Sequence, residues 1–343
     1  MDLPVEQREL SRSKRINLGT RFNALMVGDS ISTFGTQLSA FAIPTYAIKA
    51  LHATPREIGI LNTLQWVPPL FFIAFAGLLA DLFDRGRQAV LADIGCAIAG
   101  LVFYCAIIFG FANIFLLDAV VFLVGSGGAF YGIAASAMIP QLVEQQNLVH
   151  ANSRFTAARA VSSICGQGLA AILAQLRLLP VAILTDAVSY LVRGAFNLRW
   201  LASGPKNIRE NKNDERHNIV EPATGIISFL KEKPAIVHLA LAAGTFNLGA
   251  SIIASMYFPF VYQVLELSPL FIGISMGFGS FSSFLTAMYL PKFLHAKAFD
   301  KVVVWALFAA SVGAWCVPLA HIINAHLLIV FYRLFFSAAS TSF

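Results

Sequence analysis

Ten long apolar runs separated by short polar segments are the feature that most limits what this chain can fold into. Each run holds roughly the 20 residues that a helix needs to cross about 30 Å of hydrocarbon. The sequence therefore predicts a transmembrane helix for each. The runs lie at about 22–48, 58–80, 88–112, 114–139, 156–176, 179–202, 235–262, 269–291, 301–322 and 326–343.

The composition supports this interpretation and excludes other classes of protein. Hydrophobic residues make up 57% of the 343 residues and charged residues only 12%, which excludes a soluble globular domain. The fold class predicted is an all-α polytopic membrane protein. The four cysteines fall inside apolar runs without paired spacing, so they indicate small buried side chains rather than a disulfide or metal set. No metal site and no cofactor are predicted.

The basic residues predict the orientation of the chain. Outside loops hold only Lys49, Arg56 and Arg177 if the N-terminus is cytoplasmic, and most of the 24 Lys and Arg then fall on inside segments. The net charge of +6 is thus a topology signal, and no nucleic-acid partner is predicted.

The polar segments divide the chain into four parts. We predict a cytoplasmic N-terminal segment, a six-helix bundle, a hydrophilic cytoplasmic linker and a second, partial bundle of four helices. The linker is expected to end in an interfacial helix at 224–233. The four parts lie at 1–21, 22–202, 203–234 and 235–343.

The loop between the second and third runs carries a recognisable motif. It resembles the major facilitator superfamily pattern Gly-x-Leu-Ala-Asp-Arg-x-Gly-Arg-(Lys/Arg), with matches at Gly77, Leu79, Ala80, Asp81, Arg85 and Arg87. Two further stretches are similar to the drug/proton antiporter branch that contains macrolide-efflux and enterobactin-export proteins. They are Ile139–Val143 followed by Ala151–Ser153, and Asp186–Tyr190.

This resemblance implies a two-bundle fold of six plus six helices with substrate bound between the halves. About ten of the twelve helices are present, so the chain is interpreted as C-terminally truncated. The resemblance also implies a gating role for Gly77, Asp81, Arg85 and Arg87, in which Asp81 faces the N-terminal end of helix 11 and holds the cytoplasmic side closed. Gly166–Gly168 lacks the Gly-Pro pair typical of antiporters.

Ionisable residues inside the runs are the first candidates for function, because each needs a partner, water or a role. Asp29 heads a polar stripe on the first helix and is a candidate for proton coupling, with a structural hydrogen bond as the alternative. Asp186 and Arg193 lie too far apart on one helix for a direct pair, so structural partners on other helices are expected.

The expected substrate cavity takes residues from three helices. Arg333 either binds an anionic or carbonyl-bearing group or extends toward the membrane surface. Small residues at four-residue spacing, as in Gly128/Gly132 and Gly273/Gly277, predict close helix contacts. The cavity candidates are Thr33, Gln37, Asn247, Ser251, Arg333 and Ser337.

These observations favour a monomeric secondary transporter in the bacterial cytoplasmic membrane that exports small drug-like or macrolide-like compounds, coupled to protons. A siderophore or metabolite transporter and a non-transporting structural fragment are the alternatives. No His-Glu-x-x-His motif occurs, which argues against an intramembrane metalloprotease. No Gly-x4-Gly-Lys-(Ser/Thr) loop occurs, which argues against direct ATP drive.

Overall fold

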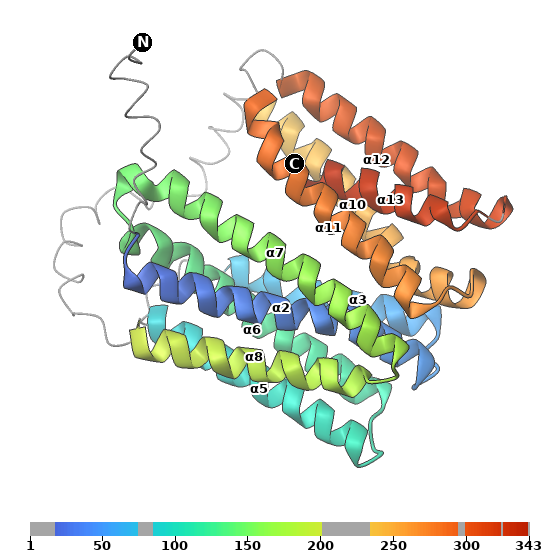
Figure 1. The fold of residues 1–343 in the computed structure, drawn as a ribbon, viewed down its shortest axis with the longest axis horizontal. Helices are drawn as coiled ribbons and strands as arrows, with labels where there is room; N and C mark the ends of the chain where they lie inside the picture. The colour runs from blue at the N-terminus through green and yellow to red at the C-terminus, as the bar shows by residue number, and fades with distance from the viewer. Residues whose placement is uncertain (1–17, 75–84, 201–233, 294–298, 324, 342–343) are drawn as a thin grey trace, which may run out of the picture.

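The fold is a bundle of long helices (Figure 1), taken from a computed structural model. The described residues are 18–74, 85–200, 234–293, 299–323 and 325–341, and they contain helices but no strand. The predicted all-α class is therefore confirmed. Residues 1–17 and 203–233, which include most of the predicted N-terminal segment and linker, lie outside the described ranges.

Ten α-helices form the described part of the chain. Most begin and end within a few residues of the apolar runs. Two short segments join them, a 3-10 turn at Gln145–Asn147 and a π-helical turn η3 at Phe260–Val264. The α-helices are α2 (Thr20–Lys49), α3 (Pro55–Ala74), α5 (Arg85–Ile108), α6 (Ile114–Leu142), α7 (Leu148–Gln175), α8 (Leu179–Trp200), α10 (Pro234–Pro259), α11 (Pro269–Phe293), α12 (Phe299–Ile322) and α13 (Leu327–Thr341).

One predicted boundary was wrong. The fifth apolar run was expected to begin at residue 156, whereas α7 already begins at Leu148. Polar residues between His150 and Arg154 interrupt the hydrophobic pattern there, although they continue the helix. Hydropathy locates the apolar part of a helix and misses a polar extension of it.

Local signals in the sequence set several helix ends. Thr54 and Glu57 form a capping box at the start of α3, in which the Thr54 backbone N–H donates to Glu57 at 2.7 Å and the Glu57 N–H donates to the Thr54 hydroxyl at 3.3 Å. Asn113 caps α6 by accepting from the backbone N–H of Leu116 at 2.9 Å. Gly110, with φ of 77°, makes the turn between α5 and α6.

Five stretches of the described helices are long and apolar enough to cross a membrane. They are Arg85–Ile108, Ile114–Leu142, His150–Gln175, Leu179–Arg199 and Pro269–Thr286. The helix α2 is not among them, because its apolar residues are interrupted by Asp29, Gln37 and several serines and threonines.

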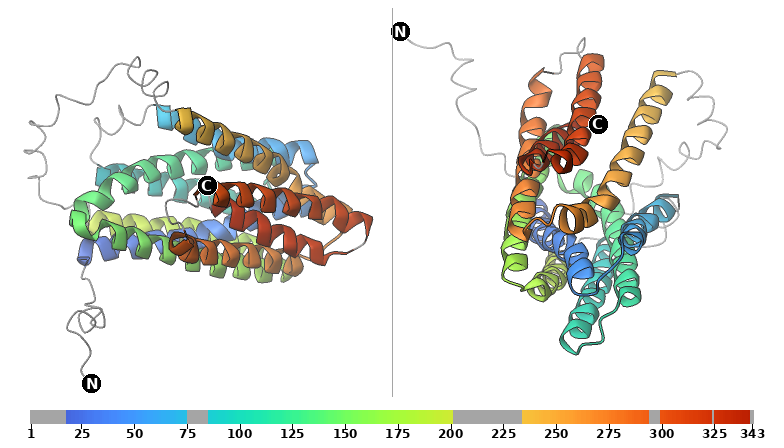
Figure 2. Two further views of the ribbon diagram at one scale, coloured as in Figure 1. Left: turned by 90° about the horizontal axis from the view of Figure 1, so that it is seen from above. Right: turned by 90° about the vertical axis from the view of Figure 1, so that its right-hand side faces the viewer.

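Part of the helix arrangement of the first half recurs in the described part of the second half. In the first half α6 packs against α3 and α5, and α2 packs against α7 and α8. In the second half α13 packs against α11 and α12 in the same way that α6 packs against its neighbours (Figures 1 and 2). A repeated helix arrangement of this kind is typical of secondary transporters.

Helices from both halves meet near the C-terminal end of α2. The rings of Phe41 and Phe258 lie edge to face with centroids 5.8 Å apart, and the hydroxyls of Thr45 and Tyr262 are 3.1 Å apart. These residues belong to one buried cluster that draws on both halves. A second cluster, around Phe22 near the N-terminal end of α2, contains first-half residues.

The seam between the halves depends on close contact of α7 and α11, which lie side by side in Figure 1. A Cβ added at Gly273 would overlap the Cβ of Ala171, whereas nothing lies within 4 Å of one added at Gly277. The predicted close contact is thus made by only the first of these two glycines. On α6, Gly125 and Gly127 contact neighbouring helices, whereas Gly128 and Gly132 do not.

We expect Gly273→Ala to lower the free energy of unfolding by about 1–3 kcal/mol, because overpacking a tight helix contact costs about that much. The thermal unfolding midpoint of the detergent-purified protein measures this. Gly277→Ala is the matched control, and its midpoint should equal or exceed that of the wild type because the added methyl group meets open space. Equal midpoints for the two variants would contradict the α7–α11 contact.

Candidate functional site

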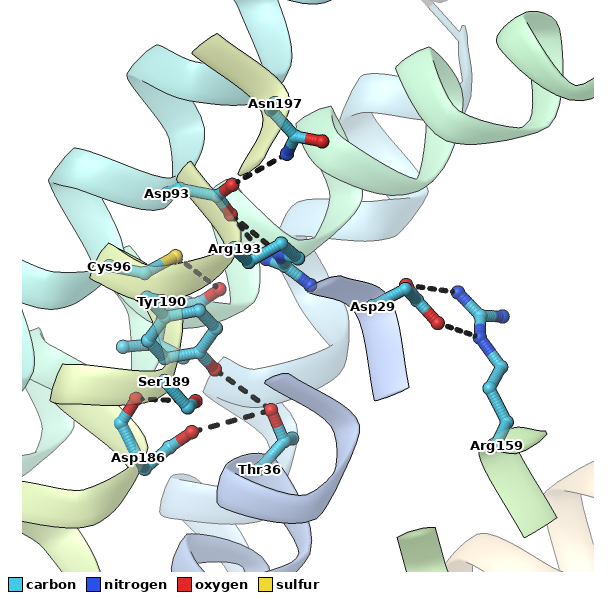
Figure 3. A network of polar contacts seen from close by, with 11 residues as sticks. Asp29, Thr36, Asp93, Cys96, Arg159, Asp186, Ser189, Tyr190, Arg193 and Asn197 are labelled. Carbon is cyan, nitrogen blue, oxygen red and sulfur yellow. Dashed lines mark hydrogen bonds and ion pairs between the residues drawn. The ribbon is translucent and has the colours of Figure 1, made fainter. Parts of the chain in front are cut away.

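Asp29 and Arg159 form an ion pair between α2 and α7 (Figure 3). The arginine Nε donates to Asp29 Oδ2 at 2.6 Å, and a second nitrogen donates to Oδ1 at 2.9 Å. The two side chains differ in exposure, with 2% of the Asp29 side chain and 46% of the Arg159 side chain accessible. A bidentate pair of this kind fixes both side chains in position. Its arginine remains open to whatever occupies the space beside α7.

A second ion pair lies deeper, between α5 and α8. Arg193 Nε donates to Asp93 Oδ1 at 2.7 Å, and Asn197 donates to the other carboxylate oxygen at 3.0 Å (Figure 3). The guanidinium also lies over the ring of Tyr131 on α6, 3.5 Å from its centroid. The side chains of Asp93 and Arg193 are 0% and 7% exposed, so this cluster holds three helices together away from solvent.

Asp186 has hydroxyl neighbours. It accepts from Thr36 on α2 at 3.4 Å, and the Thr36 oxygen also lies 3.1 Å from the Tyr190 hydroxyl. Gly35 permits this approach, because a Cβ there would clash with Ser189 and with the backbone of Asp186. As expected, Asp186 and Arg193 do not pair with each other, and both take partners on other helices.

A chain of hydrogen bonds crosses the seam between the halves. Gln167 on α7 donates from its amide nitrogen to Gln37 on α2 at 2.8 Å, and Ser280 on α11 donates to the Gln167 oxygen at 2.8 Å. Gln37 was a cavity candidate, and the structure places it at this junction. Gly166 lets α7 approach α2, since a Cβ there would come within 2.7 Å of the Phe34 carbonyl oxygen.

The other cavity candidates are not gathered into one site. Thr33 is half-buried on α2, one turn from Asp29. Asn247 and Ser251 are exposed on α10, and their side chains donate to backbone carbonyls of their own helix at 2.8 Å. The structure therefore offers no contact that joins these two residues to the ion pairs.

Arg333 lies in the middle of α13, where it is the seventh residue. Its guanidinium lies over the Tyr257 ring on α10, 3.8 Å from the centroid. Ser337, one turn further, packs against Gly279 of α11, and its carbonyl accepts from Ser283 at 2.9 Å. The guanidinium of Arg333 thus lies against α10, and the choice between an anion-binding arginine and one that extends to the membrane surface stays a prediction.

The gating motif is only partly described. Arg85 and Arg87 occupy the first turn of α5, with Arg85 half-buried and Arg87 exposed. Gly77 and Asp81 lie outside the described residues. The latch that these four residues are expected to form stays a prediction.

Arg159 is the candidate site residue that the sequence analysis did not identify. The predicted start of the fifth helix at residue 156 made this arginine look like a cytoplasmic flank. With α7 beginning at Leu148, it lies three turns into the helix. The available signal was that residue 159 already lay inside the predicted run 156–176, so its charge needed a partner just as that of Asp29 did.

The described helices form a bundle in which Asp29 pairs with Arg159 and Asp93 pairs with Arg193. The Major Facilitator Superfamily model matches residues 25–343. The chain belongs to that superfamily. It is therefore a multi-pass membrane protein of a transporter family, and the predicted two-bundle fold is confirmed.

Curated relatives are distant. The chain is 29% identical over 136 residues to an uncharacterized MFS-type transporter, YfiS of Bacillus subtilis (strain 168), covering 38% of this chain and 32% of that protein. It is 24% identical over 157 residues to macrolide efflux protein A of Streptococcus pyogenes, covering 46% of this chain and 38% of that protein. The matches thus span about a third of each relative's length.

Solved structures support the fold. A mutant of the nucleoside transporter NupG superimposes with a TM-score of 0.73 at 12% identity, covering 93% of this chain and 80% of that chain. A bacterial homologue of the human lysosomal transporter Spinster, in an inward-facing and unoccupied conformation, gives 0.63 at 15% identity, covering 93% and 73%. At such low identity these likenesses show the fold alone.

We expect Asp93→Asn to lower the free energy of unfolding by about 3–5 kcal/mol, because it leaves the Arg193 charge buried without its partner. Thermal unfolding of the purified transporter measures the loss. The control is Asp93→Asn combined with Arg193→Met, which removes both charges and should be more stable than the single variant. A single variant as stable as the wild type would contradict the structural role of this pair.

Proposed function

We propose that this transporter exports small organic compounds of a drug-like or macrolide-like class across the bacterial cytoplasmic membrane in exchange for protons. The similarity to macrolide efflux protein A and the branch motifs in the sequence support export. The distribution of Lys and Arg supports a cytoplasmic N-terminus. Alternating access between the two halves is the mechanism that this architecture supports.

The ion pair between Asp29 and Arg159 is the main support for proton coupling. A proton that binds Asp29 removes the negative charge that holds Arg159 in place. The freed guanidinium then needs water or another anion, because an unpaired charge inside a membrane is costly. Arg159 can reach water or an anion, because its side chain is 46% exposed. Proton binding is thereby linked to a movement of α7 relative to α2.

The surroundings of Asp29 favour such a switch over a purely structural contact. The neighbouring charged and titratable groups are Asp93, Arg193 and Tyr131. Asp93 and Arg193 neutralise each other. Protonation of Asp29 therefore changes the local net charge by one unit, and Arg159 is the cation that responds. The deeper pair acts as the fixed frame against which α2 and α7 move.

The seam supports alternating access with the outside end closed. The contacts of Phe41 with Phe258 and of Thr45 with Tyr262 lie toward the C-terminal end of α2, which the predicted orientation places outside. Opening outward requires these contacts to break, together with the Gln37–Gln167–Ser280 chain. In the opposite state, the Asp81 motif of the cytoplasmic loop closes the inside end.

We expect Asp29→Asn to abolish proton coupling while leaving substrate binding intact, because the amide keeps the shape of the side chain but cannot exchange a proton. In inverted vesicles carrying the transporter, a macrolide such as erythromycin should dissipate an imposed proton gradient with the wild type and not with the variant. A fluorescent dye that reports internal acidity gives the measurement.

Asp118→Asn is the matched control, because it removes a carboxylate from α6 that is not part of either ion pair. It should couple as the wild type does. Arg159→Lys should retain weak coupling, since it keeps the charge but loses the bidentate geometry. If Asp29→Asn dissipates the gradient as fast as the wild type, Asp29 is not the coupling site.

A further inference from the structure

Arg333 differs from the other arginines inside the described bundle. Arg159 and Arg193 each pair with an aspartate. Within the described ranges, no carboxylate lies within ion-pair distance of Arg333, and its Nε is buried without a hydrogen-bond partner. An ionisable group inside a membrane protein that lacks an internal counter-ion marks a binding or transport role.

The aromatic neighbours of Arg333 orient its guanidinium. One face lies 3.8 Å from the centroid of Tyr257, and Tyr332 contributes a second ring 5.6 Å away. Tyr257 is itself fixed, since it is 2% exposed and its hydroxyl lies 3.3 Å from that of Ser275 on α11. A guanidinium stacked by its face can offer a planar anion those in-plane N–H groups that Tyr257 does not bind.

Arg333 also lies near the seam between the two halves. A Cβ at Gly279 of α11 would come within 3.4 Å of the Arg333 Cβ, so α13 approaches α11 closely at this level. The next residue on α11, Ser280, donates to Gln167 of the first half. The arginine is thus one helix away from the junction where the halves separate in alternating access.

A hollow of about 460 Å³ is lined by residues of α10, α12 and α13, and Arg333 itself is not among them. Phe336, three residues after Arg333, and Ile253, four residues before Tyr257, both line it. Its volume lies within the roughly 300–1,000 Å³ range of small-molecule sites. The lining is mostly apolar and consists of Thr245, Phe246, Gly249, Ala250, Ile253, Ala310, Ser311, Ala314 and Phe336.

We propose that Arg333 binds the carboxylate of an organic anion whose apolar body occupies this hollow, which makes amphipathic organic acids the substrate class. This assignment rests on the proposed export function and narrows it. The guanidinium edge supplies two parallel N–H donors to the carboxylate. Aromatic and aliphatic side chains cover the remainder of the molecule.

The test compares binding of 1-naphthoate and 1-naphthamide to the purified transporter by isothermal titration at neutral pH. The two probes share one ring system and differ in charge. We expect the wild type to bind the acid at least about tenfold more tightly, a ratio of the size that one charge-assisted bidentate contact produces. Arg333→Met should reduce the ratio to about one, and Arg333→Lys should give an intermediate value.

Arg154→Met is the matched control, because it removes an exposed arginine from α7 and should keep the wild-type ratio. The wild-type comparison needs no variant, so a misfolded Arg333→Met protein does not prevent the test. Equal binding of the two probes to the wild type overturns the proposal, as does a preference for the acid that survives in Arg333→Met.

The outcomes separate this inference from the export proposal. If the acid shows no preference while erythromycin still dissipates the proton gradient, the organic-acid assignment fails and the exporter stands. If the acid binds through Arg333 while neither erythromycin nor 1-naphthoate alters the gradient, the binding site stands and proton-coupled export fails.

Discussion

The ion pair of Asp29 with Arg159 joins α2 to α7, and the proposed proton coupling depends on it. Charge inside a bilayer is tolerated where it is neutralised or hydrated. This pair is neutralised by a bidentate contact, and the Arg159 side chain is 46% exposed. The Asp93–Arg193 pair is neutralised and almost fully buried. Within the described residues, the first bundle thus contains one ion pair with a half-exposed arginine and one that is almost fully buried.

The seam between the halves combines tight helix contacts with hydrogen bonds between neutral side chains. Close contacts at Gly273 and Gly166 bring α7 against α11 and α2, and the Gln37–Gln167–Ser280 chain crosses the same place. Hydrogen bonds between neutral amides and hydroxyls are modest in net energy, of the order of 1 kcal/mol each. Under the proposed mechanism, contacts of this strength can form and break as the two halves move.

The sequence could predict the class, order and approximate ends of the helices, because apolar runs depend on local composition. It could also identify Asp29 and Arg333 as candidate site residues, since each is a single charge in an otherwise apolar run. The partner of Asp29 lies 130 residues away and depends on how α2 packs against α7, which one sequence does not reveal. Similarly, the spacing of Gly273 and Gly277 indicated a contact, but only the rotation of α11 decides which glycine makes it.

Protonation of Asp29 can be followed directly by infrared spectroscopy. Infrared difference spectra of the membrane-reconstituted transporter, recorded as the pH is lowered, detect the carbonyl band of a newly protonated carboxyl group. We predict a band that disappears in Asp29→Asn and persists in Asp186→Asn, accompanied by a change in the guanidinium bands of Arg159. A band unaffected by Asp29→Asn would mean that the Asp29–Arg159 pair is structural and that the transporter is driven from another site.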